Sequence, residues 1–378
     1  MPASFDENKL FDLFAYLVST DSPTYGERQQ ADKLKALLTD LGFEVSEDSA
    51  GERLGGSAGN LYGILKGTDP AREPVLFSSH LDTVSPALGK KAVLHEDGTV
   101  TSGGDTVLGA DDAAGLVEIL EGVRAAVSSG RPYGDIEVLL PVAEEVYTKG
   151  SKLFDLSRIH SKTAYVLDMS GDIGSAAIKA PSIISFKAEV KGRASHSGFA
   201  PEKGINALAA AARAIASTPQ GRLDKETTFN IGTLTSGEAS NIVPERVVLT
   251  GEARGFDHEK ALAAVLGFRE NLEREAKAIG ASVSFEHTVE VRAYSVPEDA
   301  EVTKRFLSAA ERIGIEGRTV TTHGGSDNHT LTAGGINGIV LSCGMYSVHS
   351  VNEYTKLREL AKGAALVREL ILGKAGGI

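Results

Sequence analysis

The sequence predicts an α/β protein whose sheet-bearing domain is interrupted by an inserted α+β domain. Between residues 30 and 180, short apolar runs alternate with helical stretches, which is the pattern of a sheet flanked by helices. From about Ile183 the pattern changes to strands of alternating polarity, in a β-α-β-β-α-β order. The α/β pattern then resumes toward the C-terminus. We therefore expect residues 1–181 and 294–378 to form one domain and residues 182–293 the insertion.

Polar residues end the apolar runs of the first domain. The runs are EPVLFSSH (residues 73–80), GDIEVLLPVAEE (residues 134–145) and KTAYVLDMSG (residues 162–171). Between the first two, DDAAGLVEILEGVRAAV (residues 111–127) has the spacing of a helix. Ligands of α/β sheets collect at the carboxyl ends of the strands, so these polar residues lie where a functional site is expected.

The insertion combines helices with half-exposed strands. The runs SIISFKAEVKGRA, VVLTGEARGF and SVSFEHTVEV alternate in polarity and predict strands. Between them, NALAAAARAIAS and EKALAAVLGFRENLEREAKAI predict helices. After the insertion, VTKRFLSAAERIG predicts a helix and GIVLSCG a buried strand, and a closing amphipathic helix follows. These last segments return the chain to the first domain.

Composition and charge argue against several functional classes. The formal net charge of −12 argues against a nucleic-acid surface, since phosphate backbones are bound by excess Lys and Arg. No stretch reaches the roughly 18 to 20 apolar residues of a membrane helix, and no basic segment with a cleavage site begins the chain. We therefore expect a cytoplasmic protein. The single Cys343 cannot form an intramolecular disulfide or a thiolate zinc site, so any metal would be held by imidazoles and carboxylates.

The first candidate motif is VLFSSHLDTV, in which an apolar strand ends at His80 and Asp82 follows two residues later. This spacing allows an imidazole to bind a metal while the carboxylate accepts the other ring N–H and fixes the tautomer. The alternative is a loop histidine beside a solvated aspartate. Alone, the motif does not decide between them.

The second motif is GGDTVLGADDAAG, where Asp111 and Asp112 stand at the start of a predicted helix. One aspartate there is explained by helix capping. Capping does not explain two, and adjacent carboxylates repel one another unless a cation relieves the repulsion. Both interpretations stay open at this motif.

The third motif is IEVLLPVAEEV, in which an apolar strand runs into Glu144 and Glu145. Paired acids at a buried strand end are costly without a cation, so one glutamate could bind metal while the other acts on water as a general base. An exposed strand end is the alternative. In YVLDMSG another strand ends near Asp168. Three successive strands that end in acid or histidine make coincidence improbable, and the donor set fits Zn, Co or Mn.

These motifs resemble the M20 metallopeptidases, and within them the peptidase T-like branch. The resemblance extends over nearly the whole chain. Its markers, in order, are SSHLDTV, LGADDAAG, AEEV, LDMSG, KGRASHSGFAPEKGINA, GEASNIVPE, EARGFD, GGSDNH and HSVNEY. The resemblance implies a zinc-peptidase-like catalytic domain with a mixed sheet flanked by helices. It also implies that the insertion is a ferredoxin-like lid and dimerisation domain.

The resemblance further implies two divalent metal ions, zinc being expected and cobalt or manganese possible. It assigns the ligands to His80, Asp111, Glu145, Asp168 and His349, with Asp111 bridging the ions. It also makes Asp82 the residue that orients the first histidine and Glu144 the general base. The residues themselves do not favour His349 over His323 or His329 as a ligand, and the roles of those two stay open.

The inserted domain would supply further site residues if the resemblance holds. In that pattern His196 of ASHSG reaches an active site, often that of a partner subunit, and stabilises the developing oxyanion. Asn241 and Arg254 match positions that contact the substrate's carboxylate or backbone, and Arg suits this task because its planar fork binds carboxylate bidentately. Ser326 of GGSD matches another substrate contact.

The expected activity is metal-dependent release of the N-terminal residue from short peptides, as in a tripeptidase. The alternative within the same chemistry is an amidase or deacylase that acts on N-acyl amino acids. A catalytically silent binding module is disfavoured because every expected ligand and the base are present. The expected partners are a small peptide and a second copy of the chain bound through the inserted domain, with no nucleic acid and no membrane.

Overall fold

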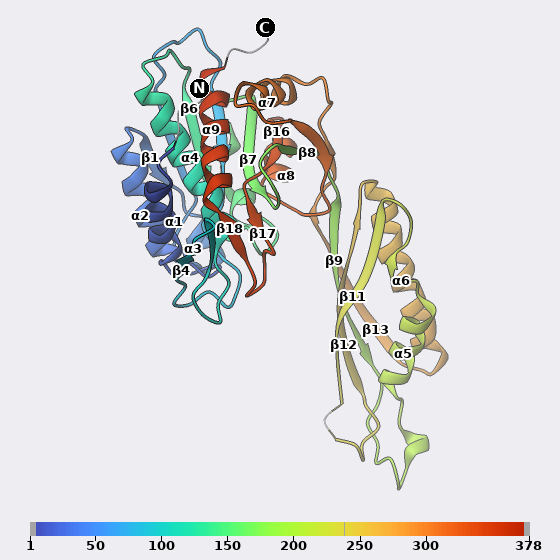
Figure 1. Cartoon of the computed structure of the whole chain (residues 1–378). Coiled ribbons are helices and arrows are strands. Elements are labelled where there is room, and N and C mark those ends of the chain that lie inside the picture. Colours follow the sequence, from blue (N-terminus) through green and yellow to red (C-terminus); the bar gives the residue numbers. More distant parts are fainter. Residues whose placement is uncertain (1–4, 238, 374–378) are drawn as a thin grey trace. The chain divides into compact units, whose positions relative to one another are not determined.

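The chain divides into two units (Figure 1). The computed structural model describes residues 5–237 and 239–373. The first unit comprises Met1–Ile178 and Ser295–Ile378, and the second comprises Lys179–Tyr294. Within the described residues, no helix is both long and apolar enough to cross a membrane.

The sheet of the first unit contains parallel strands where the apolar runs predict them. β3 (Val75–Ser78) pairs in parallel with β6 (Ile136–Leu140) and with β7 (Thr163–Met169). β16 (Asn337–Ser342) also pairs in parallel with β7. Every residue of β3 and β6 is buried, as expected for strands covered on both faces. Because these four strands run in the same direction, their carboxyl ends reach one edge of the sheet.

Antiparallel strands extend this sheet, and a smaller sheet lies in the same unit. The larger sheet has the order β1-β2-β6-β3-β7-β16-β8-β14, with β15 paired to β8, and the smaller one has the order β17-β18-β5-β4. The remaining strands of the two sheets are β1 (Glu44–Glu47), β2 (Leu61–Leu65), β4 (Ala92–Leu94), β5 (Thr99–Ser102), β8 (Ser175–Ala180), β14 (Tyr294–Ser295), β15 (Arg318–Thr321), β17 (Met345–Tyr346) and β18 (Tyr354–Lys356).

Helices flank the larger sheet (Figure 1). α4 packs against α1 and α9, while α7 and α8 contact β16. The helices of this unit are α1 (Glu7–Val18), α2 (Arg28–Asp40), α3 (Ala50–Leu54), α4 (Ala110–Ser128), α7 (Glu301–Arg312), α8 (Asn328–Ala333) and α9 (Leu357–Leu372). Asp6 shows how local sequence starts a helix, because its side chain accepts the N–H groups of Asn8 and Lys9 and so caps α1.

The second unit is an antiparallel sheet with α5 and α6 packed against it. Its strand order is β10-β11-β12-β9-β13. The core of this unit contains stacked and tilted rings of Phe186, Phe229 and Phe268, joined by small residues of α5. The elements are β9 (Ser182–Lys191), α5 (Ala207–Ser217), β10 (Gly221–Arg222), β11 (Thr227–Ser236), β12 (Arg246–Gly255), α6 (His258–Ala278) and β13 (Ser282–Val291). The predicted fold class, a mixed sheet flanked by helices with an α+β insertion, is confirmed.

The close packing of α4 on α9 depends on a glycine. A Cβ atom added at Gly122 of α4 would lie 2.5 Å from Cβ of Val367 and 2.9 Å from the carbonyl oxygen of Ala364, both in α9. Backbone and Cβ atoms cannot move aside independently of their helix, so any larger residue at position 122 must push the two helices apart.

We expect Gly122→Ala to destabilise the protein by about 1 to 3 kcal/mol, because overpacking forces backbone shifts in a dense core. Gly267→Ala in α6 is the matched control, since a Cβ there meets nothing within 4 Å. That control should be neutral or stabilising by about 0.5 to 1 kcal/mol through helix propensity. Thermal and urea unfolding of both variants checks this, and equal stability of the two would contradict it.

Candidate functional site

The candidate metal ligands of the first unit come from strand ends, one helix start and one loop. His80 follows β3, Asp168 lies near the end of β7, and Glu145 lies beyond the end of β6. Asp111 is at the start of α4, and His349 is in the loop between β17 and β18. The parallel strands therefore deliver three of these side chains to one sheet edge, where tertiary packing adds the other two.

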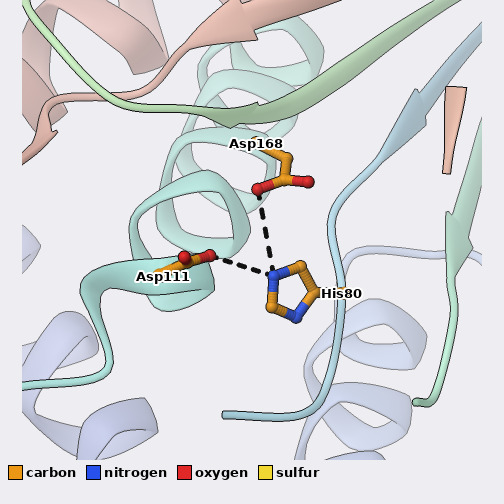
Figure 2. Close-up of side chains that lie close together, drawn as sticks. All are labelled: His80, Asp111 and Asp168. Carbon is orange, nitrogen blue, oxygen red and sulfur yellow. Dashed lines mark hydrogen bonds and ion pairs between the residues drawn. The ribbon is translucent and has the colours of Figure 1, made fainter. Parts of the chain in front are cut away.

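A first group consists of His80, Asp111 and Asp168, whose ligand atoms all lie within 4.8 Å of one another. Nε2 of His80 is 3.0 Å from Oδ1 of Asp111 and 3.9 Å from Oδ1 of Asp168. Figure 2 shows both carboxylates turned toward this one nitrogen of the ring. All three side chains are largely buried.

A second group consists of Asp111, Glu145 and His349, again within 4.8 Å. Nε2 of His349 is 3.1 Å from Oδ2 of Asp111 and 3.1 Å from Oε2 of Glu145. Asp111 thus belongs to both groups and turns a different oxygen to each. Two cation sites side by side would share this carboxylate.

The charge balance of the two groups fits divalent cations. Burial raises the pKa of Asp168, and the nearby carboxylates of Glu144 and Asp111 raise it further. Burial also raises the pKa of Glu145, although the hydrogen bond from His349 acts against it. Oε1 of Glu145 is buried and has no hydrogen-bond partner among the described residues. A cation would stabilise these carboxylates in their charged form, and imidazole with carboxylate is a donor set that zinc accepts.

The two imidazoles form hydrogen bonds with carboxylate oxygens, and each imidazole would bind the same cation as the carboxylates that it contacts. Hydrogen bonds to Asp111 and Glu145 raise the pKa of His349 to about 10, although burial opposes this. Burial disfavours the charged form of Asp111, but the hydrogen bonds with His349 and His80 outweigh it and hold the pKa of that carboxyl below its usual range.

Asp82 acts on the backbone of the paired glutamates as well as on His80. The ring Nδ1–H of His80 donates to the backbone carbonyl of Asp82 at 2.9 Å, whereas the carboxylate oxygen Oδ1 is 3.5 Å away. That carboxylate accepts the backbone N–H of Glu144 at 2.9 Å and of Glu145 at 3.3 Å, and the hydroxyl of Thr24 at 2.9 Å. The orienting contact to the ring therefore comes from the main chain, and Nε2 is left to face the carboxylates.

The two aspartates at the start of α4 have different partners. Asp112 accepts the hydroxyl of Ser79 at 2.6 Å and the backbone N–H of His80 at 3.2 Å through one oxygen. Through the other it accepts the N–H of Gly115 at 3.3 Å, which is a capping interaction. Capping therefore explains Asp112, and Asp111 is the residue that faces the histidines.

Glu144 lies in a tight turn just beyond the end of β6. It is buried, and burial raises its pKa, as do the neighbouring carboxylates of Asp327 and Glu145, against the effect of His80. The preceding Ala143 has a φ of 52°, and its N–H is held at 3.1 Å by Oε1 of Glu27. Glu144 belongs to neither ligand group, although its carboxylate is near enough to raise the pKa of Asp168.

Sequence reasoning missed two buried glutamates that hold backbone near the site. Glu353 accepts the N–H groups of Gly109 and Asp111, and Glu27 accepts the N–H groups of Tyr25 and Ala143. Glu353 stands inside the marker HSVNEY, so its place in that motif was an available signal. Neither glutamate ends an apolar strand, which was the pattern that identified the others.

The remaining candidates of the first unit lie outside both ligand groups. Ser326 is buried, and its carbonyl accepts the Nδ1–H of the buried His329 at 3.1 Å, so these two stabilise the turn before α8. His323 is exposed and belongs to neither group. A role for Ser326 in substrate binding stays a prediction.

The candidates of the second unit lie on its loops and on β12. His196 is exposed, and its Nδ1 accepts the N–H groups of Gly198 at 3.1 Å and Phe199 at 3.2 Å. The carbonyl of Asn241 accepts the N–H of Ser197 at 2.9 Å, which brings the loops of His196 and Asn241 together. Nε of the half-buried Arg254 donates to Glu252 at 2.7 Å. Their part in substrate binding stays a prediction.

Comparison with known protein families finds two peptidase signatures in the chain. The signature of the peptidase dimerisation domain (M20_dimer) matches residues 178–279. The signature of peptidase family M28 matches residues 60–220. The first signature thus coincides with most of the second unit. The second includes β3, β6 and β7 and four of the five candidate ligands, all but His349.

Similar proteins match the chain over nearly its whole length. An uncharacterised protein of Bacillus subtilis, YqjE, is 36% identical, with 97% of this chain and 98% of that protein covered. The crystal structure of the aminopeptidase PepT from Bacillus cereus is 37% identical with a TM-score of 0.88, covering 97% of this chain and 98% of the other. A tripeptidase from Staphylococcus aureus is 30% identical with a TM-score of 0.93, covering 98% and 99%. Identity at this level over whole chains, together with the dimerisation-domain signature, shows that the chain belongs to the M20 peptidases, in their peptidase T-like branch.

Proposed function

We propose that the protein is a di-metal aminopeptidase that releases the N-terminal residue of short peptides, tripeptides in particular. The observation that carries this proposal is the Asp111 carboxylate, one oxygen of which faces His80 while the other faces His349. A carboxylate shared between two groups of His and acidic ligands would suit a pair of neighbouring catalytic cations. The peptide as substrate is supported by the names of the similar proteins, an aminopeptidase and a tripeptidase.

His80, Asp111 and Asp168 would hold one cation, and Asp111, Glu145 and His349 the other. When bound, two such cations, zinc being the expected one, supply positive charge that polarises the peptide carbonyl and makes water more acidic. The hydrogen bond from His80 Nδ1 to the Asp82 carbonyl keeps Nε2 directed at the carboxylates. Asp82 in turn holds the backbone of both paired glutamates through its carboxylate.

Glu144 is the residue that would move the proton. It would remove a proton from the attacking water and deliver it to the amine nitrogen that leaves when the peptide bond breaks. Its neighbour Glu145 has an oxygen within 3.1 Å of His349, whereas Glu144 belongs to neither ligand group, so the two acids divide into a ligand and a free base. Burial of Glu144 excludes bulk water from the exchange.

The second unit would contribute to substrate binding and to assembly. By the family resemblance, His196 would stabilise the developing oxyanion, and Asn241 and Arg254 would contact the substrate's carboxylate or backbone. The dimerisation-domain signature over residues 178–279 supports a homodimer formed through this unit.

Substitution of each paired glutamate should separate their roles. Glu144→Gln should lower kcat by roughly 10²-fold to 10⁴-fold, the usual contribution of a positioned base, while cation binding stays near that of the wild type. Glu145→Gln should weaken cation binding because it removes a ligand oxygen. Steady-state kinetics and calorimetric titration with Zn²⁺ measure the two effects. Retained turnover in Glu144→Gln would contradict the base assignment.

Removal of metal should abolish hydrolysis and lower the unfolding temperature. Cations that bind only the folded state stabilise it by about 2.7 kcal/mol at a concentration one hundred times their Kd. The test is to chelate the protein exhaustively, confirm by elemental analysis that it is metal-free, and add back zinc, cobalt or manganese singly. Full activity in protein shown to be metal-free would refute the di-metal mechanism.

A substrate panel should distinguish the aminopeptidase from the deacylase. We expect metal-reconstituted protein to release the N-terminal residue of unblocked tripeptides, and N-acetylation to prevent this release because it removes the free amino group. N-acyl amino acids are assayed in parallel by mass spectrometry. Cleavage of these compounds alone, with no action on free tripeptides, would assign the protein to the amidases instead.

A further inference from the structure

Glu353 joins two segments that carry ligands of the proposed second cation site. Its side chain is buried, 1% exposed. Oε2 accepts the backbone N–H of Gly109 at 2.6 Å, and Oε1 accepts the backbone N–H of Asp111 at 2.9 Å. Glu353 also stands four residues after His349 on the loop between β17 and β18. One carboxylate thus reaches from the loop of His349 to the backbone of Asp111.

The backbone around Asp111 depends on such a contact. Asp111 has φ and ψ of −83° and 97°, and Asp112 has −123° and 34°, so neither is in helical conformation although α4 has begun. The first N–H groups of a helix have no acceptor within the helix. Gly109, at the N-cap, offers no side chain to accept them. Glu353 supplies acceptors for two of these groups, one of which is the N–H of Asp111, the residue that faces both histidines.

The loop that carries Glu353 is itself held by local hydrogen bonds. The N–H of Glu353 donates to the carbonyl of Ser350 at 3.1 Å, and the hydroxyl of Ser350 donates to the carbonyl of Ser347 at 2.7 Å. Between them, His349 has a φ of 60°. His349 and Glu353 therefore belong to one bonded turn, and a displacement of Glu353 is transmitted to His349.

We propose that Glu353 is a positioning residue that holds Asp111 and His349 in register for the second cation. This role rests on the proposed di-metal function. Glu353 touches neither ligand's metal-facing atoms: it fixes the main chain of Asp111 and, through the turn, the place of His349. Without both N–H contacts, Asp111 would still face His80 but would lose its fixed orientation toward His349. Loss of these contacts should therefore weaken cation binding at the second site.

Glu137 provides a control with the same chemistry at a different place. It is also fully buried in the first unit, and its two oxygens accept the backbone N–H groups of His160 at 2.9 Å and Ser161 at 2.7 Å. The hydroxyl of Tyr62 also donates to it. Neither N–H group belongs to a candidate ligand segment. If Glu353 only stabilised the fold, its substitution would therefore have the same effects as substitution of Glu137.

The experiment titrates metal-free, full-length protein with Co²⁺ and records the visible absorption spectrum and the heat of binding. Wild type should bind two equivalents. In Glu353→Gln the amide has only one acceptor oxygen, so one N–H group faces an NH₂ group. We expect one Co²⁺ to bind with near-wild-type affinity and the other about 10-fold to 100-fold more weakly, with a changed spectrum. Glu137→Gln should lower the unfolding temperature and leave both affinities and the spectrum unchanged.

A second variant, Glu353→Asp, tests the same role in case Glu353→Gln does not fold. It keeps the charge, but its shorter side chain cannot reach both N–H groups, so it should show the same selective loss. Normal binding of both Co²⁺ equivalents in folded Glu353→Gln or Glu353→Asp would overturn the positioning role. An equal loss in Glu137→Gln would overturn it as well. Wild type that fails to bind two equivalents would instead refute the di-metal function on which the role rests.

Discussion

The site of the first unit is organised around a carboxylate that faces in two directions. Oδ1 of Asp111 contacts His80 and Oδ2 contacts His349. Such a carboxylate must be fixed both in position and in rotation, because a turn that improves one contact breaks the other. Burial adds a second constraint, since it raises the pKa of both Asp168 and Glu145, and the charge of Asp111 raises both further, so a bound cation would favour their charged forms.

The sheet satisfies the first part of this constraint. β3, β6 and β7 are parallel, so the residues near or just beyond their carboxyl ends lie at the same edge of the sheet. Buried carboxylates that accept backbone N–H groups then fix the main chain that carries the candidate ligands. Asp82 holds the paired glutamates, Asp112 holds His80, and Glu353 holds Asp111. The acidic residues around the site therefore divide into those that face the cation positions and those that hold the main chain.

The second unit differs from the first in its sheet and in its core. Its antiparallel sheet has a phenylalanine-centred core under α5 and α6, and its candidate substrate residues lie on loops and on β12. The peptidase dimerisation signature covers most of this unit. The candidate metal ligands therefore all lie in the unit with parallel strands. This division agrees with the membership of the M20 peptidases that the whole-chain relatives show.

By itself the sequence determined the fold class and the family, because hydrophobic period and motif order are properties of the chain read in one dimension. It also nominated His80, Asp111, Glu145, Asp168 and His349, which the structure gathers into two groups, while their binding of cations stays a prediction. Only the tertiary structure decided that a backbone carbonyl orients His80, that Asp112 caps its helix, and that Glu353 holds Asp111. The last contact joins residues 242 positions apart, and no local pattern specifies which buried oxygen meets which distant N–H group.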